Sequence, residues 1–580
     1  MRSVFPRASR LFPALAVAAT TTVALCKASP AQKEEPKTPA VVNVPVDKSK
    51  HQLLVIGSGW GAVSFLRNLK HDPSTQVTVV SPRGVFLYTP LLPAATTGTV
   101  EARSIIEPIR RLLPKGARFV EASATDIDPV AKTVTCESAL LPGKSFSLSF
   151  DTLVVAVGSV ANTFGVPGVL EHCHFLKSYD DATGIRSTIH ERWEQAALPT
   201  TTPEERKRLL TFVVCGAGPT GAELAAELQD LFTSDLAKEY PDIVHEASVI
   251  VIEANSQVLS MFDRRIADHA TAAFSTQGIV TKLNTRVVGV TEQGVDVLDI
   301  PTNTKSTIPA ATVVWATGVG MHPLASSLAA KLSPQTNRRA LIVDEWLRVK
   351  GAEDRIFCVG DAASIEQKRS IDHASDLFDE FDKDGNGFLD VGEVHNLLKH
   401  ASKAYPQFQE HIRLIQTHQS QQHLSHSTFQ ELSLMVLPFL SKVESSAIQD
   451  AFDAADKDGD HLLSKTEFVD FLSAMDKHLR AMPATAQVAK QQGKYLARLT
   501  NAGRLHDVEH AEPFHWKDYG SLAFIGADEA VANLPGIGIL QGILTGLLWR
   551  GFETSGQQSI RNRVAVASDQ VRSKLFGRGV

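Results

Sequence analysis

Two glycine-rich turns in one chain restrict its fold more than any other feature. They are Gly57-Ser-Gly-Trp-Gly-Ala62 and Gly216-Ala-Gly-Pro-Thr-Gly221, and each follows an apolar run that predicts a buried strand and precedes a helical pattern. In such a turn the first glycine bends the chain, the second admits a pyrophosphate, and the third small residue lets the helix pack on the strand. One turn is weak evidence, but two predict an α/β protein with two dinucleotide sites, built on Gly57, Gly59, Ala62, Gly216, Gly218 and Gly221.

The second turn belongs to a predicted nicotinamide site. The apolar strand 248–252 ends at Glu253. A carboxylate there accepts hydrogen bonds from a ribose 2′-hydroxyl and repels a 2′-phosphate, so it favours NAD(H) over NADP(H). Glu253 lies further from Gly221 than the ~20 residues that are usual, which a longer helix and loop would explain. A further strand, 312–318, ends the unit at Gly318.

The first turn begins a unit whose strand ends carry candidate flavin-binding residues. Strand 76–80 ends at Ser-Pro-Arg, where the serine can hydrogen-bond an adenosine ribose, and strand 153–159 ends in glycine. Strand 355–361 ends in Gly-Asp, and an aspartate there can hold the ribityl chain of a flavin. Residues 89–93, Thr-Pro-Leu-Leu-Pro, are predicted to be extended and to line an isoalloxazine ring, the alternative being a packed loop. The candidates are Ser81, Arg83, Thr89, Pro90, Gly158, Gly360 and Asp361.

A calcium-binding loop interrupts the chain after Asp361. Residues 382–393, Asp-Lys-Asp-Gly-Asn-Gly-Phe-Leu-Asp-Val-Gly-Glu, place oxygen ligands at the spacing of an EF-hand loop. Gly387 takes the sharp turn, and Leu389 is the apolar position that pairs two such loops. Apolar residues on both sides predict flanking helices. The predicted Ca²⁺ ligands are Asp382, Asp384, Asn386, Phe388 through its carbonyl, Asp390 and Glu393.

A second loop, 456–467, departs from this pattern at one position. His461 replaces the glycine of the sharp turn, so a non-glycine residue must adopt a positive φ. We expect the loop to bind Ca²⁺, or alternatively to serve as the structural partner of the first loop. Its ligands would be Asp456, Asp458, Asp460, Leu462 through its carbonyl and Glu467.

The N-terminal residues predict a mitochondrial presequence. Arg2, Arg7 and Arg10 precede the apolar run Leu11–Cys26, and no acidic residue occurs before Glu34. The apolar run is shorter than the ~20 residues of a membrane helix, so a marginal anchor and a secretory signal are the alternatives. The net charge of -6 gives no reason to expect a nucleic acid as partner. Five scattered cysteines without a C-x-x-C pair argue against a disulfide framework or zinc ribbon.

The C-terminal part predicts a surface that contacts a membrane. Residues 538–552 are apolar, but too short and too polar to span a bilayer. Between residues 560 and 578, apolar side chains share one helical face and basic side chains complement them. We therefore expect a helix that lies in the membrane interface, attracted to anionic lipid. An ordinary surface or dimer helix is the alternative.

These motifs resemble the two-dinucleotide flavoproteins of the glutathione reductase class. Within that class they are similar to the type II (alternative, rotenone-insensitive) NADH:ubiquinone oxidoreductases, and the EF-hand insertion resembles that of the external, calcium-binding mitochondrial subtype. The resemblance rests on the two turns, residues 81–83 and 89–93, Gly98-Thr-Val-Glu-Ala-Arg-Ser104 and Ala484-Thr-Ala-Gln-Val-Ala489. It implies a single-subunit, FAD-containing quinone reductase that pumps no protons and dimerises through its C-terminal end. No cysteine pair of the disulfide-reductase branch is present in the sequence.

The resemblance also assigns roles to particular residues. Ala486 and Gln487 match a motif that packs a helix start against the flavin. Gln487 and Gln491 lie one helical turn apart in a region that borders the quinone, so both can face one site. Glu223, just after the second turn, matches a glutamate near the flavin and is the candidate for a proton or charge role. The alternative for Glu223 is a helix-start carboxylate that meets the helix dipole.

We therefore predict an enzyme that passes electrons from NADH through FAD to ubiquinone and is modulated by Ca²⁺. It would be a peripheral protein of the mitochondrial inner membrane, facing the intermembrane space. The alternatives are a soluble NADH oxidase or flavin reductase and a calcium-responsive signalling flavoprotein. The predicted parts are a presequence and linker (1–50), an FAD-binding domain (51–170, 346–366 and 481–530), an NAD(H)-binding domain (171–345), an EF-hand insertion (367–480) and C-terminal membrane-associating helices (531–580).

Overall fold

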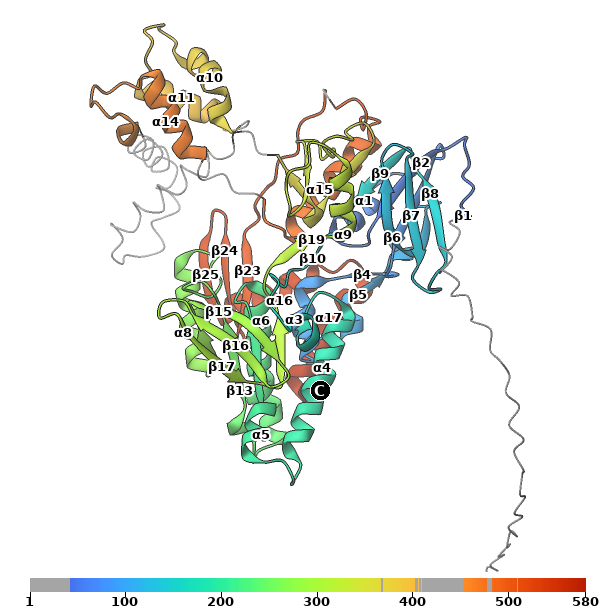
Figure 1. Ribbon diagram of the computed structural model, residues 1–580, viewed down its shortest axis with the longest axis vertical. Helices are drawn as coiled ribbons and strands as arrows, with labels where there is room; N and C mark the ends of the chain where they lie inside the picture. Colours follow the sequence, from blue (N-terminus) through green and yellow to red (C-terminus); the bar gives the residue numbers. More distant parts are fainter. Residues whose placement is uncertain are drawn as a thin grey trace, which may run out of the picture. The chain divides into compact units, whose positions relative to one another are not determined.

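A computed structural model describes residues 42–366, 369–401, 405, 408, 452–476, 482–508 and 510–579. The predicted presequence and its apolar run lie outside these residues. The described chain has a mixed α/β fold, with several sheets flanked by helices (Figure 1). This confirms the fold class that the two glycine turns predict.

The first glycine turn lies in an eight-stranded sheet with the order β1-β8-β7-β6-β3-β2-β9-β21. Its parallel centre is made of β3 (Thr75–Ser81), β2 (His51–Ile56), β9 (Thr152–Val155) and β21 (Ile356–Cys358). Every residue of β9 and β21 is buried, as expected for a parallel sheet covered on both faces. The antiparallel side is made of β6 (Arg118–Asp128), β7 (Thr133–Ser138) and β8 (Ser145–Ser149), and β1 (Val42–Asn43) pairs with β8 in parallel.

A helix from far along the chain packs on the helix that follows the first turn. The two helices are α1 (Trp60–Asn68) and α15 (Ala486–Asn501), which lie side by side in Figure 1. They cross so closely that a Cβ on Gly493 would lie 2.3 Å from the Gly61 carbonyl oxygen. The Ser64 hydroxyl also donates to the Lys490 carbonyl over 2.5 Å. The start of α15 is thereby fixed against the first dinucleotide unit.

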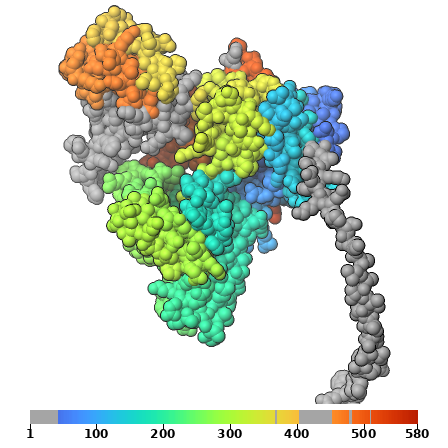
Figure 2. Space-filling model, in the orientation of Figure 1, coloured from blue at the N-terminus to red at the C-terminus, as the bar shows by residue number. Residues whose placement is uncertain are grey.

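The second glycine turn lies in a five-stranded parallel sheet. Its order is β11 (His174–Phe175), β18 (Thr312–Trp315), β12 (Thr211–Cys215), β13 (Ser248–Ile252) and β14 (Val280–Lys282). In the space-filling view the residues coloured from teal to green form one continuous lobe (Figure 2). The surrounding helices are α3 (Val169–His172), α4 (Tyr179–Ala197), α5 (Pro203–Leu209), α6 (Pro219–Leu231), α7 (Ala237–Glu239) and α8 (Arg264–Gln277).

The long interval before Glu253 is filled by helical turns. After α6 the chain forms a π-helical turn, Phe232–Leu236, then α7 and a short 3-10 turn, Val244–Glu246. The interval therefore lengthens the crossover and leaves the strand order unchanged, as the sequence analysis expected. An antiparallel sheet of β15 (Thr285–Thr291), β16 (Gly294–Asp299) and β17 (Thr304–Pro309) follows β14.

A two-stranded ribbon connects the two parallel sheets. Its strands are β10 (Ser159–Ala161) and β19 (Val319–Met321), which pair antiparallel. β10 directly follows β9 of the first sheet, and β19 directly follows β18 of the second. The remaining short elements are β4 (Val85–Leu87), β5 (Ile106–Pro108), α9 (Pro323–Lys331), β20 (Leu341–Val343) and β22 (Ala363–Ile365).

The described part of the insertion is helical and has an apolar core of its own. Its helices are α10 (Ala374–Phe381), α11 (Val391–Ala401) and α14 (Lys465–Asp476). The C-terminal part contains β23 (Ser521–Gly526), β24 (Glu529–Leu534), β25 (Gly538–Gly542), α16 (Ile543–Ser555) and α17 (Ile560–Phe576). None of the helices within the described ranges is long and apolar enough to cross a bilayer.

The prediction of an extended segment at residues 89–93 is wrong. The chain forms a 3-10 turn, η1 (Thr89–Leu91), and then the helix α2 (Leu92–Thr96). Each proline lies in the first turn of its helical element, where the missing N–H is not needed. Leu91 and Leu92 are buried, and this packing compensates for the short helices.

Candidate functional site

The predicted FAD residues meet at one edge of the first sheet. Ile56, at the end of β2, pairs with Val80 of β3 and Val155 of β9, and Val155 pairs with Cys358 of β21. This register places Ser81 at the carboxyl end of its strand, and Gly57, Gly158 and Gly360 just beyond the ends of neighbouring parallel strands. Ligands of open α/β sheets bind at this edge.

The first turn has the shape that a pyrophosphate requires. Gly57 has φ +115°, and a Cβ there would lie 2.2 Å from the Ala156 carbonyl oxygen, so only glycine fits. A Cβ on Gly59 would meet no atom within 4 Å, so this backbone faces open space. α1 begins at Trp60, directly behind it, and its free N–H groups favour an anion. These residues fit the diphosphate of FAD.

Asp361 lies in a polar network at the same edge. The Ser159 hydroxyl donates to the Asp361 carboxylate over 2.9 Å. Lys177 Nζ lies 3.5 Å from the Ser159 hydroxyl, and burial lowers the pKa of Lys177 although Asp361 opposes that shift. The Gly360 N–H donates to the Gln492 side chain of α15 over 2.7 Å. The Gly-Asp segment is thus held from β10 and α15, and the sequence patterns identified neither Gln492 nor Lys177.

Two of the other predicted FAD residues bind protein groups in this structure. The Ser81 hydroxyl is buried and lies 2.9 Å from the Ser58 hydroxyl. The Trp60 indole N–H donates to the Thr89 hydroxyl over 3.0 Å, which fixes η1 against the start of α1. Arg83 is exposed. The roles predicted for Ser81, Arg83, Thr89 and Pro90 stay predictions.

The second turn is tighter than the first. A Cβ on Gly221 would lie 1.9 Å from the Gly216 carbonyl oxygen, whereas Ala62, at the same place in the first turn, is accommodated and fully buried. The strands β12 and β18 are neighbours, so Gly216 and Gly318 lie at one edge of the second sheet. A Cβ on Gly218 would meet nothing within 4 Å. The geometry fits a second diphosphate, that of NAD(H).

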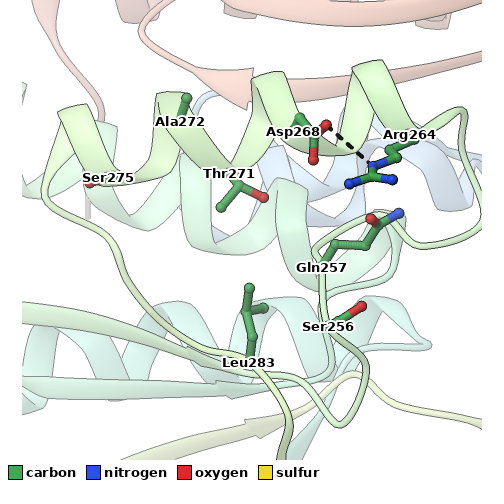
Figure 3. Close-up of a pocket in the computed structure, with 8 residues that line it drawn as sticks. All are labelled: Ser256, Gln257, Arg264, Asp268, Thr271, Ala272, Ser275 and Leu283. Atoms are coloured by element: carbon green, nitrogen blue, oxygen red, sulfur yellow. Dashed lines mark ion pairs between the residues drawn. The ribbon is translucent and has the colours of Figure 1, made fainter.

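Glu253 lies at the end of β13, beside this turn. Its carboxylate accepts from the Ala217 N–H over 2.8 Å and from the main-chain and side-chain N–H groups of Asn255 over 2.9 and 2.8 Å. Three and four residues after Glu253, Ser256 and Gln257 line a cavity of about 680 Å³ against α8, with Arg264 and Asp268 on its opposite side (Figure 3). A carboxylate at the end of this strand suits the recognition of an adenosine ribose.

Gln487 and Gln491 both face the segment 516–520. The Gln487 amide oxygen accepts from the Tyr519 N–H over 3.2 Å, and its amide nitrogen donates to the Gly520 carbonyl over 3.2 Å. The Gln491 amide makes two hydrogen bonds to the Lys517 main chain, of 2.8 and 3.0 Å. Both side chains therefore hold this segment against α15. Their predicted part in the quinone region stays a prediction.

Glu223 is buried in α6. It accepts a hydrogen bond from the Phe524 N–H of β23 over 3.2 Å and another from the Trp549 side chain of α16. Burial raises the pKa of Glu223 well above its ordinary value, and the nearby Glu553 and Glu227 carboxyls raise it further. The carboxyl therefore faces the C-terminal part of the chain, in surroundings that favour its protonated form. The proton or charge role predicted for Glu223 stays a prediction.

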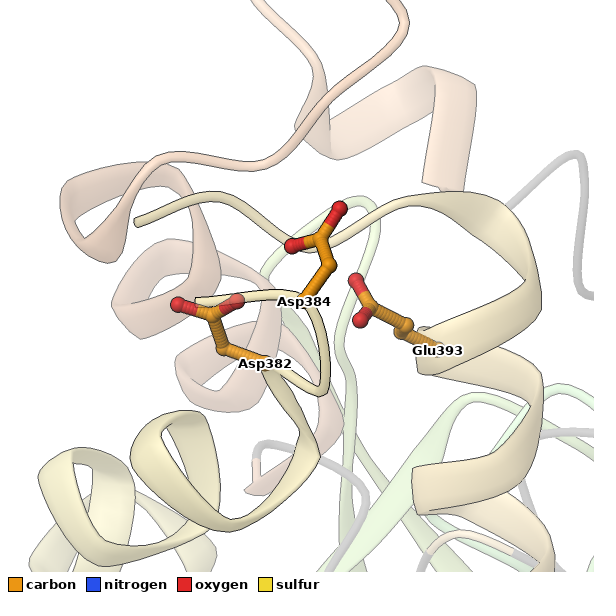
Figure 4. Close-up of side chains that lie close together, drawn as sticks. All are labelled: Asp382, Asp384 and Glu393. Atoms are coloured by element: carbon orange, nitrogen blue, oxygen red, sulfur yellow. The ribbon is translucent and has the colours of Figure 1, made fainter. Parts of the chain in front are cut away.

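The first EF-hand loop brings its carboxylates together. Asp382, Asp384 and Glu393 each offer an oxygen within 4.8 Å of the others (Figure 4). The Gly387 N–H donates to Asp382 over 3.0 Å, and the Lys383 N–H donates to Glu393 over 2.8 Å, so the turn is already closed around the ligand oxygens. Hard oxygen donors in this arrangement fit Ca²⁺.

The second loop reproduces the first despite its histidine. His461 has φ +65°, the positive value that the sequence analysis expected, and its N–H donates to Asp456 over 2.9 Å as Gly387 does to Asp382. Asp456, Asp458 and Asp460 also bring carboxylate oxygens within 4.8 Å of one another, at positions 1, 3 and 5 of the loop. Leu389 and Leu463 form an antiparallel bridge with two main-chain hydrogen bonds, so the loops pair as predicted from Leu389.

The sequence matches three families in consecutive parts. Residues 51–379 match "Pyridine nucleotide-disulphide oxidoreductase", residues 371–473 match "EF-hand domain pair", and residues 518–579 match "NDH2 C-terminal domain". The chain is 37% identical, over 93% of its length and 91% of the relative's, to the "External alternative NAD(P)H-ubiquinone oxidoreductase B2, mitochondrial" of Arabidopsis thaliana. The chain belongs to the external alternative NAD(P)H-ubiquinone oxidoreductases. A relative from Solanum tuberosum is 38% identical over 92% of the chain and 91% of its own length.

Two solved structures share the fold of this chain. The "Structure of NDH2 from plasmodium falciparum in complex with NADH" is 26% identical, has a TM-score of 0.75 and covers 91% of this chain and 99% of its own. A sulfide:quinone oxidoreductase from Aquifex aeolicus, at 15% identity and a TM-score of 0.55, shares the fold. The four described cysteines are all free, and three of them are buried.

The basic residues of α17 and of the segment after it are not all available to lipid, contrary to the sequence analysis. Arg572 pairs with Glu101 over 2.7 Å, and Lys574 pairs with Asp528. Arg578 is nearly buried and pairs with Asp235 over 3.4 Å. Helical periodicity alone could not reveal these partners, because their acids lie elsewhere in the chain. Arg561 and Arg563 remain exposed.

Proposed function

We propose that the protein is a single-subunit flavoenzyme that transfers electrons from NADH to ubiquinone. The observation that carries this proposal is the match over nearly the whole chain to relatives named as NAD(P)H-ubiquinone oxidoreductases. The two glycine turns lie at the carboxyl ends of the strands of two parallel sheets. They support the proposal because the reaction requires a flavin site and a nicotinamide site.

FAD, when bound, supplies the hydride chemistry, and the protein residues position it. Gly57 and Gly59 would cradle its diphosphate, and Asp361 would hold its ribityl chain. Gly216, Gly218 and Gly221 would hold the diphosphate of NADH, and Glu253 would bind the adenosine ribose. Because β10 pairs with β19, the two sheets are connected, which supports a fixed distance between the flavin site and the nicotinamide site.

The C-terminal part would bind the protein to the surface of the mitochondrial inner membrane. α16 exposes a row of large apolar side chains, which a soluble protein rarely leaves bare. These are Ile543, Leu544, Leu547, Leu548 and Phe552. α17 adds the exposed Ile560, Val564, Val571, Leu575 and Phe576. The relatives are named "External", which favours the side of the membrane that faces the intermembrane space. The same apolar surface of α16 and α17 also suits a homodimer interface.

Ca²⁺ would modulate this activity through the EF-hand pair. The insertion begins directly after β22, which follows the Gly-Asp segment, and ends just before α15, whose Gln492 binds Gly360. A change of loop conformation on binding Ca²⁺ would therefore act on both ends of the segment that completes the FAD site.

A coupled assay tests the proposed function. The purified protein, reconstituted with FAD, should convert NADH and a short-chain ubiquinone to NAD⁺ and quinol in a 1:1 ratio without oxygen. Rapid oxidation of NADH by oxygen alone, with no quinol formed, would identify the alternative, a soluble NADH oxidase. Flavin that NADH reduces but neither acceptor reoxidises would favour the signalling flavoprotein. An EGTA titration of the same assay measures the effect of Ca²⁺.

A further inference from the structure

A buried carboxyl in the C-terminal helix α16 has no cation to balance it. Glu553 is 5% exposed, and of the ion pairs between described residues none includes it. One of its carboxyl oxygens, Oε2, has no hydrogen-bond partner, and neither has the buried side-chain oxygen of Gln557, one turn further on. A buried carboxylate with no cation and one unpaired oxygen is costly, whereas a protonated carboxyl supplies a hydrogen-bond donor to a site that otherwise has two unpaired acceptor oxygens.

Two ionisable side chains interact with the Glu553 carboxyl, one through a hydrogen bond and one through its charge. Tyr88, buried just before η1, forms a hydrogen bond with it, and Glu223 of α6 lies close enough for their charges to interact. Three basic residues of α16 and α17 have other partners: Arg550 and Lys574 pair with Asp528, and Arg563 donates to the Gln557 main chain. Burial raises the pKa of Glu553 to about 7, and the Tyr88 hydrogen bond opposes that rise.

The contacts of Tyr88 lead to the first glycine turn. Its ring packs on Trp60 with the ring centroids 5.1 Å apart, and Trp60 also donates to Thr89, the next residue. Space for the Tyr88 hydroxyl exists only because residue 556 is glycine, where a Cβ would lie 2.2 Å from it. Glu553 is thus joined through a single side chain to the start of the FAD-binding helix. On the solvent side of the same helix α16 lie the exposed Leu548 and Phe552.

Quinone reduction requires a proton that NADH does not supply. Hydride from NADH provides two electrons and one proton, whereas a quinone needs two electrons and two protons to become quinol. We propose that Glu553 holds this second proton and releases it when the quinone is reduced. This inference rests on the proposed function. The O–H bond of Glu553 breaks as a quinol O–H bond forms, and Glu553 is left as a carboxylate beside Tyr88.

Solvent can return the proton through a neighbouring cavity. A cavity of about 350 Å³ is lined by Glu227, Phe524 and Trp549, among others, and it is large and polar enough to hold water. Glu223 accepts hydrogen bonds from two of these lining residues, Phe524 and Trp549. Water in the cavity therefore reaches the neighbours of the Glu223–Glu553 pair. Between turnovers a proton can pass from this water to Glu223, and from Glu223 to Glu553.

Rapid-mixing kinetics on the full-length, FAD-loaded protein test the proposal. One experiment follows flavin reduction by NADH, and a second follows reoxidation by a short-chain ubiquinone from pH 5.5 to 9. In the unaltered protein reoxidation should slow above pH ~7, because the carboxyl must be protonated to donate. Glu553→Gln should slow reoxidation 10²-fold or more, the usual contribution of a positioned acid, and abolish this pH dependence. Flavin reduction should be unchanged.

Tyr88→Phe gives a second, directional test. It removes the hydrogen bond that lowers the pKa of Glu553, so the alkaline limb should move to higher pH while the rate at pH 6 is kept. Infrared difference spectra between pH 6 and 9 should contain a protonated-carboxyl band that Glu553→Gln removes. Glu512→Gln, an exposed acid in the same C-terminal part, is the control and should behave like the unaltered protein.

The outcomes separate this proposal from the proposed function. If the unaltered protein is reduced by NADH but reduces no quinone, the proposed function fails. If it reduces quinone and Glu553→Gln keeps both the rate and the pH limb, the proton role of Glu553 is refuted. Should Glu553→Gln fail to fold, an unshifted limb in Tyr88→Phe refutes the proposal on its own.

Discussion

Neutralising Glu253 should weaken discrimination between NADH and NADPH. The half-buried carboxylate lies at the end of β13 and accepts three hydrogen bonds, one from the second glycine turn and two from Asn255. The variant Glu253→Gln keeps its size and removes its charge. We expect the ratio of kcat/KM for NADPH to that for NADH to rise.

The size of the effect follows from the charges and the hydrogen bonds. Two unit charges 4 Å apart in water interact by about 1 kcal/mol, and a 2′-phosphate carries -1.5 to -2 charges, so removing the repulsion is worth about 2 kcal/mol. This corresponds to a change of about 30-fold in the ratio. The glutamine has a single acceptor oxygen, which can accept from either the Ala217 N–H or Asn255. The other donor is left unpaired at a cost of about 1 kcal/mol. That loss affects both nucleotides equally and cancels in the ratio.

Steady-state kinetics with both nucleotides, at low and at 0.5 M salt, measure the ratio. Its change should shrink at high salt, because the repulsion is screened. Glu204→Gln, an exposed acid in the first turn of α5, serves as the control. If Glu253→Gln weakens NADH and NADPH use by the same factor, the carboxylate only supports the turn, and the argument for NADH specificity is wrong.

Three further changes probe other parts of the molecule. Gly221→Ala should move the second turn by about 1 Å and lower kcat/KM for NADH by about 10²-fold, with the FAD content unchanged. The control Ala62→Gly should leave kcat/KM for NADH unchanged. If Gly221→Ala has the NADH kinetics of the unaltered protein, the close contact at Gly221 is contradicted. Glu393→Gln should lower Ca²⁺ affinity at least ten-fold in calorimetry, and an unchanged isotherm would remove Glu393 from the ligand set. Leu547→Glu should lower binding to anionic vesicles in a flotation assay, with Val130→Glu as the control for an exposed apolar residue elsewhere, and undiminished flotation would argue against α16 as the membrane contact.

The glycine turns and strand ends could be predicted because their signals are local. A buried parallel strand is a continuous apolar run, and the strand predicted at 248–252 agrees with β13 to the residue. The positive φ of His461 followed from its place in the loop alone. The prediction for segment 89–93 was wrong because prolines are typical both of extended segments and of helix starts. Only the packing of this segment in the folded protein favours the helical form.

Side-chain partners from distant parts of the chain were beyond sequence reasoning. Gln492 lies in the same helix as Gln487 and Gln491, but nothing local distinguishes the glutamine that binds Gly360. Glu553 resembles any polar residue of an amphipathic helix, and its burial against Tyr88 depends on how residues 88 and 553 meet in three dimensions. The resemblance to a family directed attention to Glu223 but carried no signal for this second carboxyl.

The strand order has a consequence for how the protein is made. All five strands of the second sheet come from residues 174–315, so that unit can complete itself soon after its last strand is synthesised. The first sheet needs β21, and α1 needs α15, whose last residue is Asn501. At a synthesis rate of about 5–20 residues per second, α1 waits roughly 20–90 s for its partner helix. During that interval the nascent chain exposes the apolar surface on which α15 will pack, so chaperones have their main opportunity to act on the FAD-binding half.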